Sequence, residues 1–248
     1  MLPSPESNFC IDSNGVGESN ALLQTQCAVS EASTEVNRAV PLPPSASTHI
    51  RKFTLNQEGA DASNTVELGF EKRNREFAVG RHCAQAALQQ FGITADVPVD
   101  VDRKPVWPAG IAGSISHSHH YAWATVLKQD AVLKSIGIDT EIIVDDATLG
   151  QVVNEITTEA EQARLSDIHS DHRTAFTILF SAKESIYKCL YPMNQQFFGF
   201  HDVELIAATD QTVTFAQQPS NPNYSIAPRQ LTAHYTIHQN DVFSAIWI

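Results

Sequence analysis

The stretch HRTAFTILFSAKESIYKCL, residues 172–190, carries the clearest structural pattern in the chain. Its apolar residues recur at intervals of three and four, which is the spacing that gathers them on one face of an α-helix. Proline stands at position 192, and a proline disfavours the helical conformation in the residue before it. The stretch therefore predicts a helix of about five turns that ends at this proline.

Other strands and helices are predicted on both sides of this helix. Strands are expected where polar and apolar residues alternate or where short apolar runs occur, at residues 49–55, 112–118, 122–127, 132–144 and in several pieces of 197–248. Further helices are expected at residues 71–92, with Gly92 as a stop, and at 157–168, where Thr158 and Glu161 form a capping signature. The order is strand, helix, strands and then strand, helices, strands. It predicts an α+β protein made of two similar halves.

The N-terminal segment differs in composition from the rest. Residues 1–47 are rich in Ser, Asn, Gln, Glu and Pro and end in PLPPSAS, which is typical of a tail or a loosely packed extension. We expect the first α+β half at residues 48–135 and the second at 136–248.

Composition limits the classes of partner. The chain has 248 residues and a formal net charge of −12, which argues against a general role in coating nucleic acid or an anionic membrane. Eight of the 16 Lys and Arg residues nevertheless lie between Arg51 and Lys104, so a local anion-binding face is compatible with the acidic whole. The four cysteines form no C-x-x-C pair, and neither a signal peptide nor an apolar run of membrane-spanning length is present. We expect a cytoplasmic protein without a membrane span.

The segment GIDTEI contains two acids that share one strand face. Asp139 and Glu141 are two residues apart, so their side chains point to the same side of a strand. Two adjacent carboxylates suit Mg²⁺ or Mn²⁺. The alternative is an exposed strand face with ordinary acids.

The predicted helix at 172–190 carries an acid and a base one turn apart. Glu184 and Lys188 are four residues apart and share a helix face. The alternative is a solvent-facing ion pair that contributes only about 0.3–0.5 kcal/mol. The many apolar neighbours on this helix favour a position beside buried surface.

Basic residues form a second candidate site. Lys72, Arg73 and Arg81 lie on the predicted helix at 71–92, and Arg103 and Lys104 lie on the loop that follows. A solvated helix face is the alternative. The chain contains no Walker A run, no G-x-G-x-x-G, no G-x-S-x-G and no H-E-x-x-H, so the standard nucleotide cradles are excluded.

The stretch GSISHSHHYAWATV, residues 113–126, holds three histidines in four positions. Zinc would need a further ligand at a suitable spacing, and no Cys/His motif supplies one. His119 and His120 are interpreted as turn residues without a role.

Four segments in this order resemble the surfactin-type 4′-phosphopantetheinyl transferase superfamily, with most similarity to its enterobactin synthetase component D branch. They are KRNREFAVGR, KPVWPAGIAGSISHS, GIDTE and FSAKESIYK, and the resemblance covers about residues 48–192. It implies two pseudo-twofold-related α+β halves with coenzyme A between them. It also implies transfer of phosphopantetheine from coenzyme A to a serine of an apo acyl or peptidyl carrier protein, with release of 3′,5′-ADP.

The resemblance assigns roles to individual residues. Asp139, Glu141 and Glu184 correspond to Mg²⁺ ligands, and Lys188 to the cation on the diphosphate. His117 is expected to act with Lys188 and Mg²⁺ in neutralising the charge that develops during transfer. The expected coenzyme A contacts are Arg73, Arg81, Lys104, Pro105, Ser116, His117 and Lys188. A general base is needed for the carrier serine, and both Glu184 and Glu161 are candidates. A metal ligand is a weakened base, because the cation stabilises its ionised form, so the choice between the two stays open.

Two other functions compete with this hypothesis. One is a different Mg²⁺-dependent nucleotide phosphotransferase, which would explain the acids but not the KP, SHS and AKES segments together. The other is a non-catalytic module that binds carrier proteins, against which the complete set of acids and Lys188 argues. We expect no nucleic-acid partner. We also expect a monomer, because two halves in one chain form a complete cleft.

Overall fold

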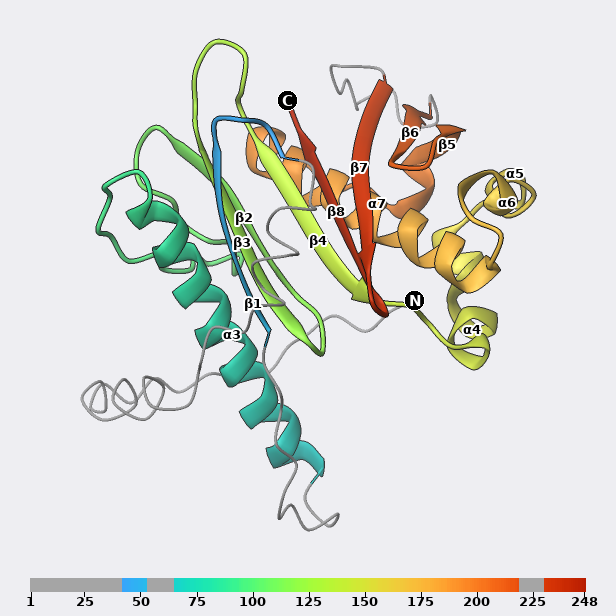
Figure 1. Ribbon diagram of the computed structural model, residues 1–248, viewed down its shortest axis with the longest axis horizontal. Coiled ribbons are helices and arrows are strands. Elements are labelled where there is room, and N and C mark those ends of the chain that lie inside the picture. The colour runs from blue at the N-terminus through green and yellow to red at the C-terminus, as the bar shows by residue number, and fades with distance from the viewer. Residues whose placement is uncertain (1–41, 53–64, 219–229) are drawn as a thin grey trace.

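The computed structural model describes residues 42–52, 65–218 and 230–248, and it describes side chains of the first long helix from residue 73 onward. Strands in these ranges form one sheet of three strands and one of five. Helices pack on both sheets (Figure 1), so the predicted α+β class is confirmed. The predicted extension falls outside the described residues up to residue 41, and the domain boundaries stay predictions.

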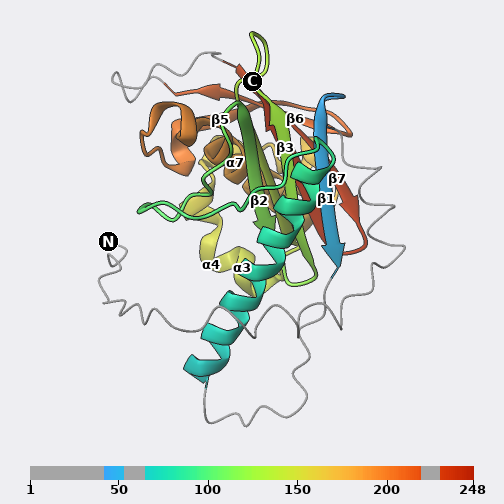
Figure 2. The same cartoon turned by 90° about the vertical axis from the view of Figure 1, so that its left-hand side faces the viewer.

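The N-terminal sheet has the antiparallel order β1-β3-β2, with β1 (Ala46–Lys52), β2 (Ile111–His117) and β3 (Tyr121–Lys128). Helix α3 (Thr65–Gln89) lies across one face of it (Figures 1 and 2). Small and aliphatic side chains of α3, such as Ala84 and Leu88, pack there with Ala124 of β3. The predicted strand 49–55 thus begins at Ala46, earlier than expected, and residues 53–55 of it lie outside the described ranges. Gly92 adopts a φ of +72° after the helix, in agreement with its predicted role as a stop.

The C-terminal sheet has the antiparallel order β4-β8-β7-β6-β5. Its strands are β4 (Ile136–Ile142), β5 (Val203–Ala208), β6 (Thr212–Gln217), β7 (Gln230–His238) and β8 (Asp241–Trp247). Helix α7 (His172–Asn194) packs along β4 and β8 and buries Phe176, Leu179 and Ile186 in the largest core cluster. The strong apolar pattern of this helix therefore covers the second sheet. Of the predicted strand pieces in 197–248, residues 219–229 lie outside the described ranges.

The two ends of helix α7 follow local chemistry, but its C-terminus differs from the prediction. Asp171 precedes the helix and its side chain accepts from the backbone N–H of Thr174. The helix continues past Pro192 to Asn194, so a stop at the proline was wrong. A proline removes its own N–H donor and crowds the carbonyl four residues before it, but the chain after it still closes through a bond from Gln195 N to Tyr191 O of 2.8 Å.

The segment between β4 and α7 is more helical than predicted. Helix α4 (Asp146–Ile156) was missed, although Leu149, Val152, Val153 and Ile156 have helical spacing and Asp145 caps the start. The single helix expected at 157–168 is instead two short ones, α5 (Glu159–Gln162) and α6 (Leu165–Ile168), and the 3₁₀ turn η1 (Phe200–Asp202) lies beyond α7. The chain tightens at Arg164, whose N–H bonds to Glu161 O only three residues back, and this breaks the helix.

The two sheets meet along a seam between their edge strands β2 and β4. Ser114 Oγ accepts the N–H of Ile138 at 3.1 Å, and Ser116 Oγ accepts that of Thr140 at 3.2 Å. A third core cluster lies between the sheets and joins Trp123 of β3 to Ile138 of β4 and Phe243 of β8. Alternating serines on one strand therefore replace part of a backbone ladder and hold the second strand beside the first.

Gly137 of β4 is required by the close approach of helix α7. A Cβ atom at this position would meet the carbonyl oxygen of Ser185 and lie 2.5 Å from the backbone nitrogen of Cys189. We expect Gly137→Ala to lower the free energy of unfolding by about 3 kcal/mol or more, because backbone atoms cannot yield as a side chain can. Urea titration followed by circular dichroism measures this change.

Gly150 provides the matched control for that substitution. It lies inside α4 with nothing within 4 Å of an added Cβ, so Gly150→Ala is expected to stabilise slightly, by about 0.5–1 kcal/mol. Equal effects of the two substitutions would contradict the close packing of α7 on β4.

Two further findings concern the described residues only. None of their helices combines the length and the apolar character needed to cross a membrane. Cys83 and Cys189 are buried, and Cys83 Sγ donates to Ala122 O at 3.5 Å, while Cys10 and Cys27 lie outside the described ranges.

Candidate functional site

Asp139 lies at the seam and collects three donors. Its side chain is 3% exposed. Its Oδ1 accepts from Lys188 Nζ at 2.6 Å and from Ser116 Oγ at 2.9 Å, and its Oδ2 accepts from Ser181 Oγ at 2.9 Å. A buried carboxylate is costly unless it is paired and hydrogen-bonded, and here strand β2 and helix α7 supply both.

Glu141 and Glu184 complete an acidic group around Lys188. Strand alternation puts Glu141 on the same face of β4 as Asp139, and Glu184 lies one turn before Lys188 on α7. Burial, together with the nearby Asp139 and Glu184 and against the effect of Lys188, raises the pKa of Glu141 from 4.5 to about 8. Burial and Asp139 likewise raise the pKa of Glu184, with Lys188 opposing. The group has too little positive charge for its three acids.

Lys188 is the ammonium that compensates this group. Burial alone would lower its pKa, but Asp139, Glu184 and Glu141 together raise it. The side chain of Lys188 is still 28% exposed. The ammonium of Lys188 is therefore hydrogen-bonded to Asp139 while part of the side chain stays accessible to solvent.

The raised pKa of Glu141 predicts a dependence of stability on pH. Folded Glu141 keeps its proton up to a pH of about 8, whereas the unfolded chain releases it near 4.5. The folded state then binds more protons, so the free energy of unfolding falls as pH rises between these two values. Denaturant titrations in EDTA measure this slope, and Glu141→Gln should flatten it. A variant with the same slope as the unchanged protein would contradict the assignment.

A cation-lined cavity of about 570 Å³ opens between α3, β2 and the loop after α3. The guanidinium of Arg81 lies over the Phe77 ring at 4.7 Å, and its Nε and Nη1 atoms are buried without a hydrogen-bond partner among the described residues. Burial lowers the pKa of Arg81. The predicted residues that line this cavity are Arg73, Arg81, Pro105 and His117, and Glu76 and Arg103 join them. Buried guanidinium donors that lack acceptors suit an anionic ligand.

A second cavity of about 400 Å³ continues from the first toward helix α7. Arg103, Pro105 and Ile115 line both cavities, so the two adjoin. The second is lined largely by aromatic and apolar groups, among them Trp107 and Tyr187, and Lys188 reaches its wall. The acidic group around Lys188 thus borders a continuous hollow that begins at Arg81.

The loop at residues 99–105 holds Lys104 beside two acids and a tyrosine. Lys104 Nζ lies 3.3 Å from Asp100 Oδ2, 3.2 Å from Asp102 Oδ2 and 4.9 Å from the centre of the Tyr191 ring. It lines the apolar cavity and not the cation-lined one. Arg103, in a left-handed conformation with a φ of +63°, is the basic residue of this loop that faces both cavities. The sequence pattern placed Arg103 on this loop but gave it no role in the site.

Glu161 does not lie open to a substrate. It is fully buried, its Oε2 accepts from Lys183 Nζ at 2.7 Å and from Thr158 N at 3.0 Å, and its Oε1 accepts from Leu205 N at 3.0 Å. Lys183 also donates to the carbonyls of Ile156 and Phe200. Both carboxylate oxygens of Glu161 are therefore engaged in holding α5, β5 and α7 together.

The three histidines of the β2–β3 turn separate in the structure. His117 Nδ1 lies 3.8 Å from Glu76 Oε2 of α3. His120 Nδ1 is 2.9 Å from Oδ2 of the buried Asp241, whose Oδ1 accepts from Ser118. Within the part of the chain that the structure describes, no three His, Cys, Asp or Glu side chains converge closely enough to hold a metal ion. Asp241 gave no signal in the sequence, because it starts a strand far from this turn.

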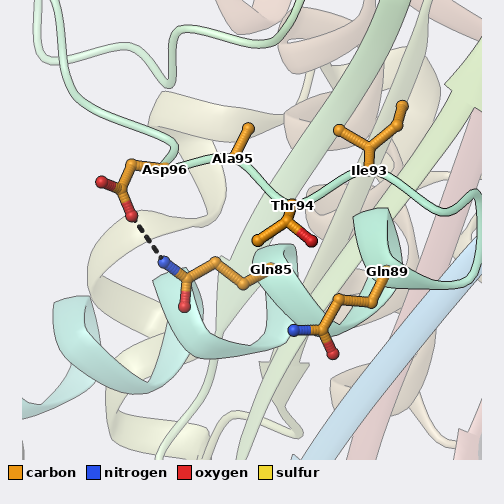
Figure 3. A pocket seen from close by; sticks show the side chains of 6 residues that line it. All are labelled: Gln85, Gln89, Ile93, Thr94, Ala95 and Asp96. Carbon is orange, nitrogen blue, oxygen red and sulfur yellow. Dashed lines mark hydrogen bonds between the residues drawn. The ribbon is translucent and has the colours of Figure 1, made fainter.

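A separate shallow cavity of about 270 Å³ lies beside the C-terminal half of α3 (Figure 3). Gln85 of the helix donates to Asp96 of the following loop at 3.0 Å across it. None of the predicted site residues lines this cavity, so it is separate from the candidate site.

Comparison with known proteins identifies the family. The family model described as the 4′-phosphopantetheinyl transferase N-terminal domain matches residues 61–127, and that of the 4′-phosphopantetheinyl transferase superfamily matches residues 135–240. The 4′-phosphopantetheinyl transferase PptT of Mycobacterium tuberculosis is 37% identical over 147 residues, which cover 57% of this chain and 61% of PptT. Enterobactin synthase component D of Escherichia coli K12 is 38% identical over 142 residues, 57% of this chain and 66% of that protein.

A third relative aligns over a longer stretch. The 4′-phosphopantetheinyl transferase Svp of Streptomyces mobaraensis is 34% identical over 175 residues, 67% of each protein. With PptT and component D the alignment spans less than two thirds of the relative's length. The two consecutive family matches and the alignment with Svp agree with the acids, the lysine and the cavities described above: the chain belongs to the 4′-phosphopantetheinyl transferase superfamily.

Proposed function

We propose that this protein transfers the 4′-phosphopantetheine group from coenzyme A to a serine of an apo acyl or peptidyl carrier protein and releases 3′,5′-ADP. The proposal rests on one observation, which is that the cation-lined cavity adjoins the cavity bordered by Lys188. Buried, unpartnered nitrogens of Arg81 line a cavity that adjoins a second cavity bordered by Lys188. Coenzyme A has a 3′-phosphate at one end and a diphosphate further along, which matches one cationic centre in each cavity.

The cation-lined cavity would take the adenosine end. Arg73, Arg81, Arg103 and His117 would contact the 3′-phosphate, and Pro105 would pack near the adenosine. Arginine donors suit phosphate because their fork matches its oxygens. Ser116 donates to Asp139, so a phosphate contact from Ser116 would require its hydroxyl to turn.

The side-chain chemistry of the acidic group suits a divalent cation. Asp139, Glu141 and Glu184 interact electrostatically with Lys188, and hard carboxylate oxygens are the ligands that Mg²⁺ prefers. Since these side chains do not converge on one point among the described residues, binding would require them to draw together. These three residues would hold the ion. When bound, Mg²⁺ would neutralise charge on the diphosphate oxygens.

The residues of the chain would then position the reacting groups. The carrier serine oxygen forms a bond to the phosphorus that carries pantetheine, and the bond from that phosphorus to the bridging oxygen breaks, so that 3′,5′-ADP leaves with the electron pair. Lys188 would stabilise the charge on the diphosphate. The serine proton would go to Glu184, directly or through water, because Glu184 is partly exposed and Glu161 is enclosed by Lys183, Thr158 and Leu205.

We also propose that the protein acts in the cytoplasm and as a monomer. One chain supplies both cavities and all three acids, so catalysis needs no second copy.

Mass spectrometry tests the function directly. The protein is incubated with coenzyme A, Mg²⁺ and apo carrier proteins of the fatty-acid and nonribosomal types. A carrier that gains one phosphopantetheine supports the proposal. No gain with any carrier, while coenzyme A still binds, would favour the non-catalytic module instead.

Arg81 predicts a specific kinetic effect. Arg81→Ala should raise the KM for coenzyme A about 10- to 100-fold, because a hydrogen bond to a charged group contributes about 1.5–3 kcal/mol, and should change kcat little. Arg75→Ala is the control, since Arg75 is exposed on the same helix and does not line the cavity. Steady-state rates with varied coenzyme A measure both, and an unchanged KM in Arg81→Ala would remove Arg81 from the site.

A further inference from the structure

Asp139 and Lys188 form a contact that conflicts with metal binding by the same carboxylate. Asp139 Oδ1 accepts from both Lys188 and Ser116, and Oδ2 accepts from Ser181. The side chain is almost fully buried, so no further open side is available. The three donors occupy three of about four lone-pair sites of the carboxylate, and the remaining site on Oδ2 is enclosed because the residue is buried. A divalent cation can therefore reach this carboxylate only where one of the donors leaves.

Two of the three donors are held in place by other contacts. Ser116 Oγ also accepts the N–H of Thr140 at 3.2 Å across the seam. Ser181 Oγ is 2.8 Å from Ser244 Oγ, which contacts Ser185 Oγ at 2.6 Å in the same buried cluster. These serines belong to the packing of the sheets and α7. Their hydroxyl protons can rotate, but their oxygen atoms cannot leave Asp139 without a change in the fold.

Lys188 is the donor that can move. Its side chain is long and rotatable, is 28% exposed and lines the cavity next to α7. The cavity is where the diphosphate of coenzyme A lies in the proposed function. The ammonium can therefore exchange an oxygen of Asp139 for an oxygen of the diphosphate by rotation of its own side chain.

We propose that Lys188 and a divalent cation compete for Asp139, and that the diphosphate of coenzyme A releases Asp139 to the cation by taking up Lys188. This inference rests on the proposed function for the identity of the diphosphate. Its consequence is thermodynamic coupling: coenzyme A tightens metal binding, and the metal tightens coenzyme A binding by the same factor. Lys188 thus holds the acidic group together until both ligands are present.

The competition is tested by metal binding without coenzyme A. Mn²⁺ binding to the full chain is measured by electron paramagnetic resonance for the unchanged protein and for Lys188→Gln. The variant is expected to bind Mn²⁺ about tenfold more tightly or better, within the usual range of site–site coupling. Equal or weaker binding by Lys188→Gln would overturn the proposal.

A matched control separates competition from a general charge effect. Lys104→Gln removes the same charge from the same cavity wall, but Lys104 contacts Asp100 and Asp102 and not Asp139. Its Mn²⁺ affinity should change little. An increase equal to that of Lys188→Gln would attribute the effect to net charge and would also overturn the proposal.

The coupling is tested by repeating the titrations with coenzyme A. The unchanged protein should gain about tenfold in Mn²⁺ affinity, and Lys188→Gln should gain much less, because its Asp139 is already released. Equal gains would contradict the exchange.

These outcomes are independent of the transfer assay. Transfer to a carrier without the tighter Mn²⁺ binding of Lys188→Gln would keep the function and reject the exchange. Tighter Mn²⁺ binding by Lys188→Gln without transfer to any carrier would reject the transfer function and keep the competition for Asp139. Glutamine keeps a polar side chain beside the acids but removes the ammonium charge, and Lys188→Met, folded in the presence of Mn²⁺, provides a second variant with the same expected direction.

Discussion

Asp139→Asn is expected to lower kcat/KM for phosphopantetheine transfer by about a thousandfold or more, because a bound cation stabilises the charge of such a transition state by several kcal/mol. Asp139 is the carboxylate on which Lys188, Ser116 and Ser181 converge. Asparagine keeps the shape and one acceptor oxygen but loses the negative charge that attracts both Lys188 and a divalent cation. The loss should therefore appear mainly in kcat.

Steady-state transfer assays with a carrier protein measure this effect. Asp210→Asn is the matched control, because Asp210 is exposed in the β5–β6 turn and should leave the rates unchanged. Thermal unfolding of both variants checks the fold, since a serine hydroxyl can rotate to accept from the new amide. Activity of folded Asp139→Asn near that of the unchanged protein would remove Asp139 from the catalytic group.

Local patterns explain which elements were predictable. The helical spacing of residues 172–190 and the alternation of β4 arise from burial of one face each, so single segments carry the information. The capping box of Thr158 and Glu161 is also local and is present as predicted. Helix α4 has the same kind of apolar spacing, so the sequence contained enough information to predict it, although it was not predicted.

Contacts between distant segments could not be predicted in this way. The acids were recognised as chemically suitable, but the ion pair of Lys188 with Asp139 joins residues 49 positions apart. The seam of Ser114 and Ser116 along β4 and the clasp of Ser118 and His120 on Asp241 depend likewise on how the sheets meet. The types of side chain indicate which chemistry a site can perform, but the packing of the fold determines which side chains come into contact.

Glu161 stands at a position that matches the family's candidate base, but its surroundings in the structure do not suit that role. Its place before α7 made it a candidate base, yet Lys183 Nζ lies 2.7 Å from its Oε2 and both residues are almost fully buried. Burial lowers the pKa of Lys183, and Glu161 opposes this. The pair therefore has a structural role, because each charge offsets the cost of burying the other.

Lys183→Met is expected to lower the free energy of unfolding by about 3–5 kcal/mol, because it leaves the buried carboxylate of Glu161 without its cation. It also removes the donor to the carbonyls of Ile156 and Phe200. Adding Glu161→Gln removes the unpaired charge but keeps an acceptor for Leu205 N, so the double variant should be more stable than Lys183→Met alone. Urea unfolding at neutral pH measures the free energy of unfolding of the unchanged protein, of Lys183→Met and of the double variant.

The double variant also decides between a charge effect and a packing effect. If Lys183 acted only by filling space, Glu161→Gln would add its own cost and the double variant would be the least stable of the three. Lys128→Met, at an exposed lysine that lies over the Phe91 ring, should change the free energy of unfolding by less than about 0.5 kcal/mol. A loss in Lys183→Met no larger than in Lys128→Met would mean that the buried pair does not hold α7 to its neighbours, and Glu161 would again be free to act as a base.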